Sequence, residues 1–116
     1  MDLSKGDVVL VEFPFTDLSQ TKLRPAIVLS VSVALNEVTL CFISSQNVSH
    51  LTSAEFALKS DEPEFLGTGL RVSSKVRVTR MITLQHQLIQ RRIGKLSSRQ
   101  IQQLDTLLIQ AFQLTV

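Results

Sequence analysis

The chain is poor in the residues from which many known sites are built. It has no tryptophan and no tyrosine, so few aromatic rings other than those of six phenylalanines are present for stacking. Its single cysteine, Cys41, cannot form an internal disulfide and is typical of a reducing compartment. No run of about 18 apolar residues occurs, which predicts no membrane span. Residues 1–5 lack the charged and then apolar pattern of a signal peptide, so we expect a cytoplasmic protein.

Motifs of metal and nucleotide enzymes are also missing. The two histidines, His50 and His86, are far apart in the sequence and form no zinc pattern with one cysteine. The four glycines are scattered and make no phosphate-binding loop. We therefore expect no metal and no cofactor. The chemistry that remains is one in which the substrate supplies its own nucleophile, as RNA does with its 2′-hydroxyl group.

Acidic residues are scarce in the second half of the chain. Residues 1–64 carry a net charge of −5, whereas residues 65–116 carry +7 and contain a single acid, Asp105. This asymmetry indicates either an anionic partner near the second half or an uneven surface charge.

The residues that are present predict one domain over residues 1–116. Apolar and β-branched runs, separated by turn residues, indicate short strands and therefore an α+β fold with a curled antiparallel sheet. Pro14 should end the first strand, because proline cannot donate to a strand ladder. The polar, turn-like residues 16–23, the short connector 34–37 and the loop 60–69 separate further strands. The strands are expected at 7–13, 26–33, 38–43, 54–59, 70–84 and 88–93, and a turn or bulge at Ser73 and Ser74 is the alternative to an unbroken strand at 70–84.

A helix is expected at the C-terminal end. Ser97 and Gln100 have the spacing of a capping box, and Leu96 and Ile101 are placed for a hydrophobic staple. Apolar residues then recur at helical spacing and form one stripe, which indicates a core or dimer contact. The stripe comprises Ile101, Leu104, Leu107, Leu108, Ala111 and Phe112.

Basic residues alternate with apolar residues within the segment 70–84. Arg71, Lys75 and Arg77 would lie on one face of an unbroken strand, together with Ser73 and Thr79. Cations at that spacing suit successive phosphates of a bound strand, although an ordinary solvated strand face has the same pattern.

Three blocks of the sequence resemble one known family. The first is Gly6–Val11, followed after a polar loop by Leu23–Ser30 (LRPAIVLS), and the second is Leu40–Gln46 (LCFISSQ). The third comprises residues 70–83, residues 91–96 and the terminal helix. Nearly the whole chain thereby resembles the MazF/PemK toxins, and the first block is the most specific part.

This resemblance implies a fold, an activity and partners. The fold would be an SH3-like barrel with a C-terminal helix, and the protein a homodimer. The activity would be metal-independent, sequence-specific cleavage of single-stranded RNA by attack of the 2′-hydroxyl. A cognate antitoxin would cover the RNA site with a flexible tail.

The resemblance also assigns site residues. The catalytic arginine of the family falls on Arg24, whose backbone Pro25 pushes toward an extended conformation. Its guanidinium suits a phosphate, although pairing with Asp17 is the structural alternative. The catalytic threonine falls on Ser44, and Ser45 is the neighbouring alternative. The expected RNA contacts are Lys22, Ser45, Gln46, Arg71, Lys75 and Arg77.

A conventional general base is not evident. Some members have an acid beside a glutamine where this chain has Ser74 and Lys75, and a histidine where it has residues 19–21. The 2′-hydroxyl proton would then pass to water, to Asp17 or to a hydroxyl network. The alternatives to an enzyme are a CcdB-like toxin that poisons gyrase and a degenerate member that binds antitoxin without cutting.

Overall fold

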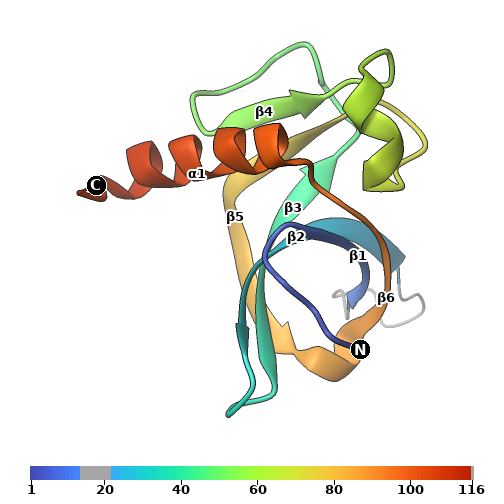
Figure 1. The fold of residues 1–116 in the computed structure, drawn as a ribbon, viewed down its shortest axis with the longest axis vertical. Helices are drawn as coiled ribbons and strands as arrows, with labels where there is room; N and C mark the ends of the chain where they lie inside the picture. Colours follow the sequence, from blue (N-terminus) through green and yellow to red (C-terminus); the bar gives the residue numbers. More distant parts are fainter. Residues whose placement is uncertain (14–21, 116) are drawn as a thin grey trace.

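The computed structural model describes residues 1–13 and 22–115 (Figure 1). In these residues, six strands form one antiparallel sheet, and a single α-helix follows the last strand. None of their helices is long and apolar enough to cross a membrane. The strands and the helix are β1 (Asp7–Phe13), β2 (Lys22–Ser32), β3 (Glu37–Ser44), β4 (Glu55–Leu58), β5 (Ser74–Gln85), β6 (Ile89–Lys95) and α1 (Ser98–Phe112), with 3₁₀ turns η1 (Pro63–Thr68) and η2 (His86–Leu88).

The sheet has the strand order β4-β5-β3-β2-β1-β6, which leaves β4 and β6 at its edges. Figure 1 shows the sheet curling round so that β1, β2, β3, β5 and β6 surround an interior, while α1 lies beside β4 and β5. The curl is barrel-like but is not closed by pairing of the two edges. The predicted α+β fold, with a curled antiparallel sheet and a C-terminal helix, is confirmed.

The two faces of the sheet carry separate core clusters. Neighbouring residues alternate between them, because successive side chains of a strand point to opposite faces. Val8 and Ile27 join the cluster that includes residues of α1, whereas Val9 and Val28 join the second cluster. Phe42 packs against this second cluster, and its face also carries the candidate site described below.

Helix α1 begins as its sequence predicts. Ser97 is the N-cap and accepts a hydrogen bond from the Gln100 backbone nitrogen at 3.1 Å, while the Gln100 side chain accepts from Ser97 N at 2.8 Å. The apolar stripe, however, divides along the helix. Its first part, residues 101–108, packs into the core, whereas Phe112 is 50% exposed.

Two strands begin at other positions than the hydrophobic pattern indicates. Strand β2 starts at Lys22, four residues before the expected start, because polar residues can pair with β1 as well as apolar ones. Strand β5 starts at Ser74, because Ser73 instead hydrogen-bonds Ser60 N at 2.8 Å and holds the preceding segment as a loop. The predictions for Pro14 and for residues 16–21 lie outside the described residues.

Turn η1 lies directly on the edge strand β6. A Cβ atom on Gly94 would fall 2.4 Å from the carbonyl oxygens of Gly67 and Thr68, so only glycine allows this approach. Gly69 ends the turn with φ 75°, a left-handed conformation that glycine adopts without strain. Residues 70–73 then lead from η1 into β5.

Candidate RNA-binding groove

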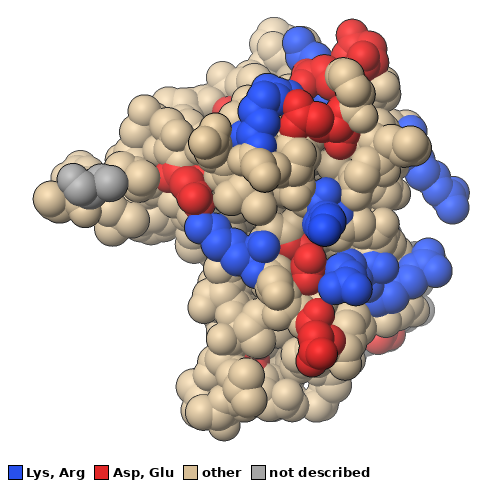
Figure 2. Space-filling model, in the orientation of Figure 1, with Lys and Arg blue, Asp and Glu red and all other residues tan. Residues whose placement is uncertain are grey.

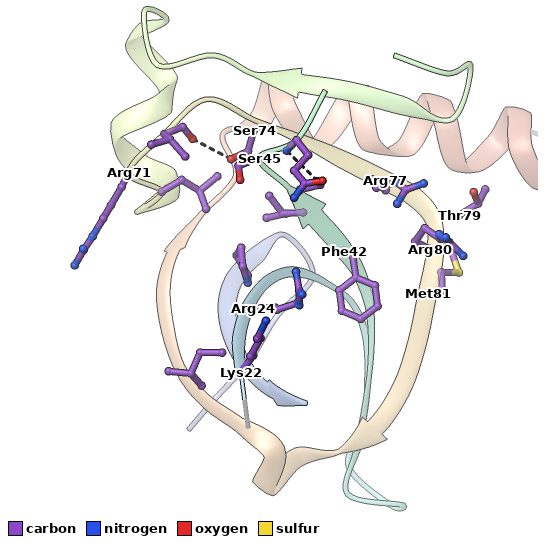
Figure 3. A pocket seen from close by; sticks show the side chains of 17 residues that line it. Lys22, Arg24, Phe42, Ser45, Arg71, Ser74, Arg77, Thr79, Arg80 and Met81 are labelled. Atoms are coloured by element: carbon purple, nitrogen blue, oxygen red, sulfur yellow. Dashed lines mark hydrogen bonds between the residues drawn. The ribbon is translucent and has the colours of Figure 1, made fainter. Parts of the chain in front are cut away.

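A groove of about 1100 Å³ opens beside the ends of β2 and β3 and the first half of β5 (Figure 3). Its described lining contains five cations and no aspartate or glutamate. Seven of the eight predicted site residues line it, and only Lys75 does not. The lining residues are Lys22, Leu23, Arg24, Pro25, Phe42, Ile43, Ser44, Ser45, Gln46, Leu70, Arg71, Val72, Ser74, Arg77, Thr79, Arg80 and Met81.

Strand register explains why residues distant in sequence meet here. Arg77 pairs with Phe42, and Phe42 pairs with Ala26, so these three side chains share one face of the sheet. In the adjacent row, Lys75 pairs with Ser44. Continuing the β2–β3 register by two residues places Arg24 opposite Ser44. The register therefore brings the two predicted catalytic residues together on the face that carries Arg77.

Arg24 lies in β2, opposite Val11 of β1, and its side chain is exposed. Figure 3 shows Arg24 and Lys22 within the curl of the sheet, on the same side as Phe42. Because Arg24 and Lys22 are two residues apart on one strand, their side chains leave the same face. The alternative partner, Asp17, lies in the segment that the structure does not describe.

Ser44 is the last residue of β3, where the strand gives way to a loop. Its Oγ accepts a hydrogen bond from the Gln46 backbone nitrogen at 3.1 Å, which orients the hydroxyl at the strand end. Ser45 and Gln46 are exposed and also line the groove. A hydroxyl and an amide thus stand beside the cations, as recognition of a phosphate and a base edge would require.

The expected row of solvated cations on one strand is not what the structure contains. Arg71 lies in the loop before β5, and Lys75, although on β5, has a side chain only 9% exposed. The Lys75 Nζ donates to a Glu55 carboxylate oxygen at 3.1 Å and to the His50 carbonyl at 3.1 Å. Lys75 therefore pairs with a buried carboxylate and does not line the groove, so the expected contact between Lys75 and RNA has no support in this geometry.

Glu55 is a buried acid beside the groove residue Arg77 that the sequence did not indicate. Its side chain is 3% exposed and accepts hydrogen bonds from Thr52 N, Lys75 Nζ and Arg77 Nε. Burial alone would raise the pKa of this carboxyl, but these three hydrogen bonds and the charge of Lys75 lower it from 4.5 to about 2. No sequence signal marked Glu55, because its cationic partners are 20 and 22 residues away.

A bulge in β5 adds a cation, Arg80, that regular alternation does not predict. Met81 pairs with Cys41 and Arg77 pairs with the next residue, Phe42, so residues 78–80 have no partner on β3. Bulges of this kind redirect side chains. Thr79 and Arg80 are exposed and line the groove. In an unbroken strand, Arg80 would point to the face opposite Arg77.

Positive charge in the groove comes from both halves of the chain. Lys22 and Arg24 belong to the half with net charge −5, and Arg71, Arg77 and Arg80 to the half with +7. The charge asymmetry of the sequence therefore locates only part of the site. The face of the molecule in Figure 2 carries acidic side chains beside basic ones, so an acid-free groove contrasts with a mixed surface.

The cysteine thiol and the two histidines are not available as reactive groups in the groove. Cys41 is fully buried, and burial raises the pKa of its thiol to about 12, which excludes a thiolate nucleophile near neutral pH. Neither His50 nor His86 lines the groove. Within residues 1–13 and 22–115, no cluster of His, Cys, Asp and Glu is arranged to hold a metal ion.

Solved structures share this fold. The Mycobacterium tuberculosis toxin MazF-mt6 aligns with a TM-score of 0.73 at 21% identity, over 95% of this chain and 99% of that chain. A mycobacterial endoribonuclease in complex with its cognate antitoxin aligns with a TM-score of 0.73 at 13% identity, over 99% of both chains. Another mycobacterial endoribonuclease aligns with a TM-score of 0.68 at 15% identity, over 97% of this chain and 92% of that chain.

Sequence comparison gives the family. No curated protein sequence matches the chain. The family described as PemK-like, MazF-like toxin of type II toxin-antitoxin system matches residues 4–112, which is almost the whole chain. Together with the shared fold, this match shows that the chain belongs to the PemK-like, MazF-like family of toxins of type II toxin–antitoxin systems.

Proposed function

We propose that residues 1–116 form a single toxin domain that acts in the cytoplasm as a metal-independent endoribonuclease on single-stranded RNA. The observation that carries this proposal is a groove with five cations, a strand-end hydroxyl and no described acid. Such a lining suits a polyanion whose phosphates must be held close to polar groups. Membership of the toxin family and structural likeness to two proteins described as endoribonucleases support the same activity.

In the proposed reaction, the 2′-oxygen of a ribose attacks the adjacent phosphorus and the bond from phosphorus to the 5′-oxygen breaks. The products are a 2′,3′-cyclic phosphate and a 5′-hydroxyl end. Arg24 stabilises the charge that develops on the phosphoryl oxygens, because a guanidinium presents paired donors to them, and it or a water protonates the leaving oxygen. Ser44 orients the reacting groups, and water or a hydroxyl network accepts the 2′-hydroxyl proton.

Contacts to the RNA follow from the position of each side chain. Lys22, Arg71 and Arg77 would hold phosphates, and the bulge residue Arg80 joins them. Ser45 and Gln46 carry hydrogen-bonding groups suited to base edges or phosphate oxygens. Phe42 offers the groove's only described aromatic ring, on which a base can stack.

Two protein partners are part of the proposal. One neighbour in structure is in complex with its cognate antitoxin, and we expect an antitoxin for this chain as well. A homodimer is supported by the apolar C-terminal end of α1 and the residues just after it, where Phe112 and Leu114 are 50% and 55% exposed. A second copy would bury these side chains.

The decisive experiment uses the purified protein, a mixed-sequence single-stranded RNA and excess EDTA. We expect cleavage, with 2′,3′-cyclic phosphate and 5′-hydroxyl ends, and we expect a 2′-deoxy substitution at the mapped cut to block it. Cleavage that needs an added metal, or that tolerates the deoxy substitution, would contradict the mechanism. Antitoxin binding without any cleavage would indicate a degenerate member, and capture of gyrase without cleavage would indicate a CcdB-like toxin.

A further inference from the structure

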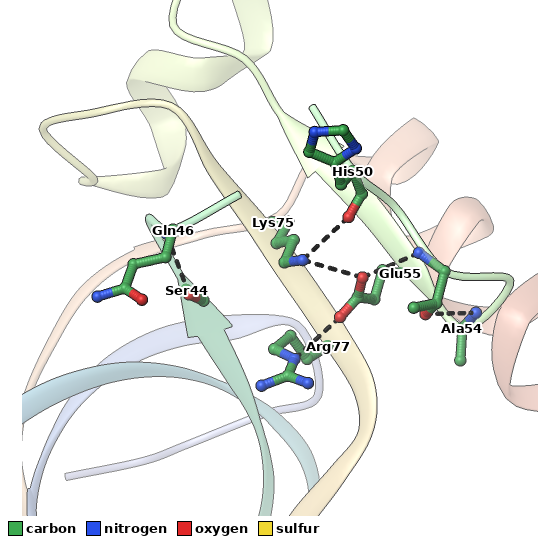
Figure 4. A network of polar contacts seen from close by, with 8 residues as sticks. Ser44, Gln46, His50, Ala54, Glu55, Lys75 and Arg77 are labelled. Carbon is green, nitrogen blue, oxygen red and sulfur yellow. Dashed lines mark hydrogen bonds and ion pairs between the residues drawn. The ribbon is translucent and has the colours of Figure 1, made fainter. Parts of the chain in front are cut away.

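The buried carboxylate of Glu55 contacts the groove through one arginine (Figure 4). Glu55 lies on the edge strand β4 and pairs with Arg77 of β5. One carboxylate oxygen accepts from Arg77 Nε at 2.9 Å, and the other accepts from Lys75 Nζ at 3.1 Å and from Thr52 N at 2.9 Å. The two carboxylate oxygens therefore accept from different donors, and one of them accepts from Arg77.

The backbone nitrogen of Thr52 and the ammonium of Lys75 both help to keep this carboxylate charged. An isolated carboxylate that is only 3% exposed would carry a large desolvation cost, and it would tend to take up a proton. The Lys75 ammonium, itself only 9% exposed, offsets that cost from the side away from Arg77. Arg77 thus has a permanently ionised partner at neutral pH.

Arg77 connects the buried pair to the groove. Its side chain is 38% exposed and lines the groove, whereas Glu55 and Lys75 do not. A guanidinium donates from Nε and from both terminal nitrogens, and Glu55 uses Nε. Figure 4 shows the terminal nitrogens of Arg77 directed away from Glu55. The donors that suit a phosphate are therefore held on the groove side.

We propose that Glu55 is a positioning residue for RNA cleavage, which holds the Arg77 guanidinium by Nε so that its terminal nitrogens meet a substrate phosphate. This inference rests on the proposed function. A free arginine side chain must lose rotamer freedom when it binds, whereas a guanidinium already fixed by a carboxylate loses less. Glu55 accordingly acts through Arg77 and touches no RNA itself.

The test is a double-mutant cycle on an RNA oligonucleotide that carries the mapped cut. Glu55→Gln should lower kcat/KM by about tenfold to a hundredfold, the range typical of a misplaced positioning group. In an Arg77→Ala background, the same substitution should have no further effect, because the group it positions is gone. An equal effect in both backgrounds would show a merely structural role and overturn the inference.

Two variants separate positioning from folding. Glu55→Gln leaves the Lys75 ammonium buried without its anion, so Glu55→Gln with Lys75→Met removes both charges and should give the same kinetic loss in a stable protein. Glu64→Gln is the matched control, because Glu64 also binds an arginine through Nε, but its partner Arg99 lies outside the groove lining. We expect Glu64→Gln to leave kcat and KM unchanged.

A direct readout does not depend on activity. The Arg77 Nε–H signal in an NMR spectrum should exchange slowly with water in the wild-type protein and rapidly after Glu55→Gln. Slow exchange in the variant would overturn the inference even if cleavage falls. If the wild-type protein cuts RNA and Glu55→Gln cuts equally well, the inference about Glu55 is wrong but the proposed function stands. If the wild-type protein does not cut RNA, the proposed function is wrong as well.

Discussion

Arg24 has an exposed guanidinium on a strand whose backbone the following proline constrains. We expect Arg24→Ala to reduce RNA cleavage by at least about a hundredfold, the usual cost of losing a group that stabilises a transition state. Arg24→Lys should recover little of this activity, because an ammonium lacks the planar pair of donors. Initial rates on the mapped oligonucleotide measure both effects.

Controls for this prediction come from the same chain. Arg91→Ala removes an exposed arginine of β6 that does not line the groove, and its cleavage rate should match that of the wild-type protein. Thermal unfolding of Arg24→Ala should remain within a few degrees of the wild type. Undiminished cleavage by Arg24→Ala would show that another group carries the reaction.

The titration of Glu55 predicts how stability depends on pH. Its pKa in the folded protein, about 2, lies below the ordinary 4.5, so its contribution is complete above pH 4.5 and is lost as the pH falls toward about 2. Each unit of pKa difference corresponds to about 1.4 kcal/mol, so ionised Glu55 contributes about 3 kcal/mol to the free energy of unfolding.

Urea unfolding at pH about 6 and pH about 3 measures this loss. The wild-type protein should lose more stability between the two values than the variant with Glu55→Gln and Lys75→Met, whose position 55 does not titrate. Equal losses in the two proteins would place the acid sensitivity at other carboxyl groups.

Among the elements, the bulge in β5 has the clearest consequence for function. It turns Arg80 into the groove, so Arg80→Ala should weaken binding to RNA and reduce the slope of log affinity against log salt by about one. Fluorescence anisotropy with a 2′-deoxy-blocked oligonucleotide at several salt concentrations gives that slope. An unchanged slope would mean that Arg80 contacts no phosphate, and Arg91→Ala again serves as the reference.

Regular features of the elements could be predicted from the sequence. Alternation and turn residues indicated where six strands lie along the chain, and Ser97 with Gln100 indicated the start of α1, because these signals act locally. The start of β2 at Lys22 and the bulge in β5 could not be predicted. Both depend on which strand lies alongside, and a single sequence carries no direct signal of pairing.

The same division holds for the candidate site. Arg24 and Ser44 were indicated by family resemblance, and the structure places both in one groove, although their roles stay predictions. The sequence pattern predicted that Lys75 lies in solvent, and it did not indicate Glu55. Both results have the same cause. Sequence gives the charge of a side chain but not its burial, and only pairing of β4 with β5 brings this acid to this base.

At the scale of the whole molecule, the exposed apolar C-terminal end of α1 predicts that two copies of the chain associate. If Phe112 packs against a second copy, Phe112→Glu should shift the protein from dimer to monomer, because a buried charge without a partner is costly. Sedimentation velocity over a range of concentrations measures the shift. A wild-type protein that stays monomeric throughout would contradict the proposed homodimer, and a dimer unaffected by the substitution would place its interface elsewhere.

The contact of Gly94 with η1 bears on how such a toxin can become harmless. Any side chain at position 94 must displace the backbone of Gly67 and Thr68, and the chain that leaves this turn carries Leu70 and Arg71 to the rim of the groove. Strand β6 itself contributes nothing to the lining. A cell under pressure to silence the protein can therefore do so with one methyl group in an outlying strand, while every residue that we propose to contact RNA remains as it was.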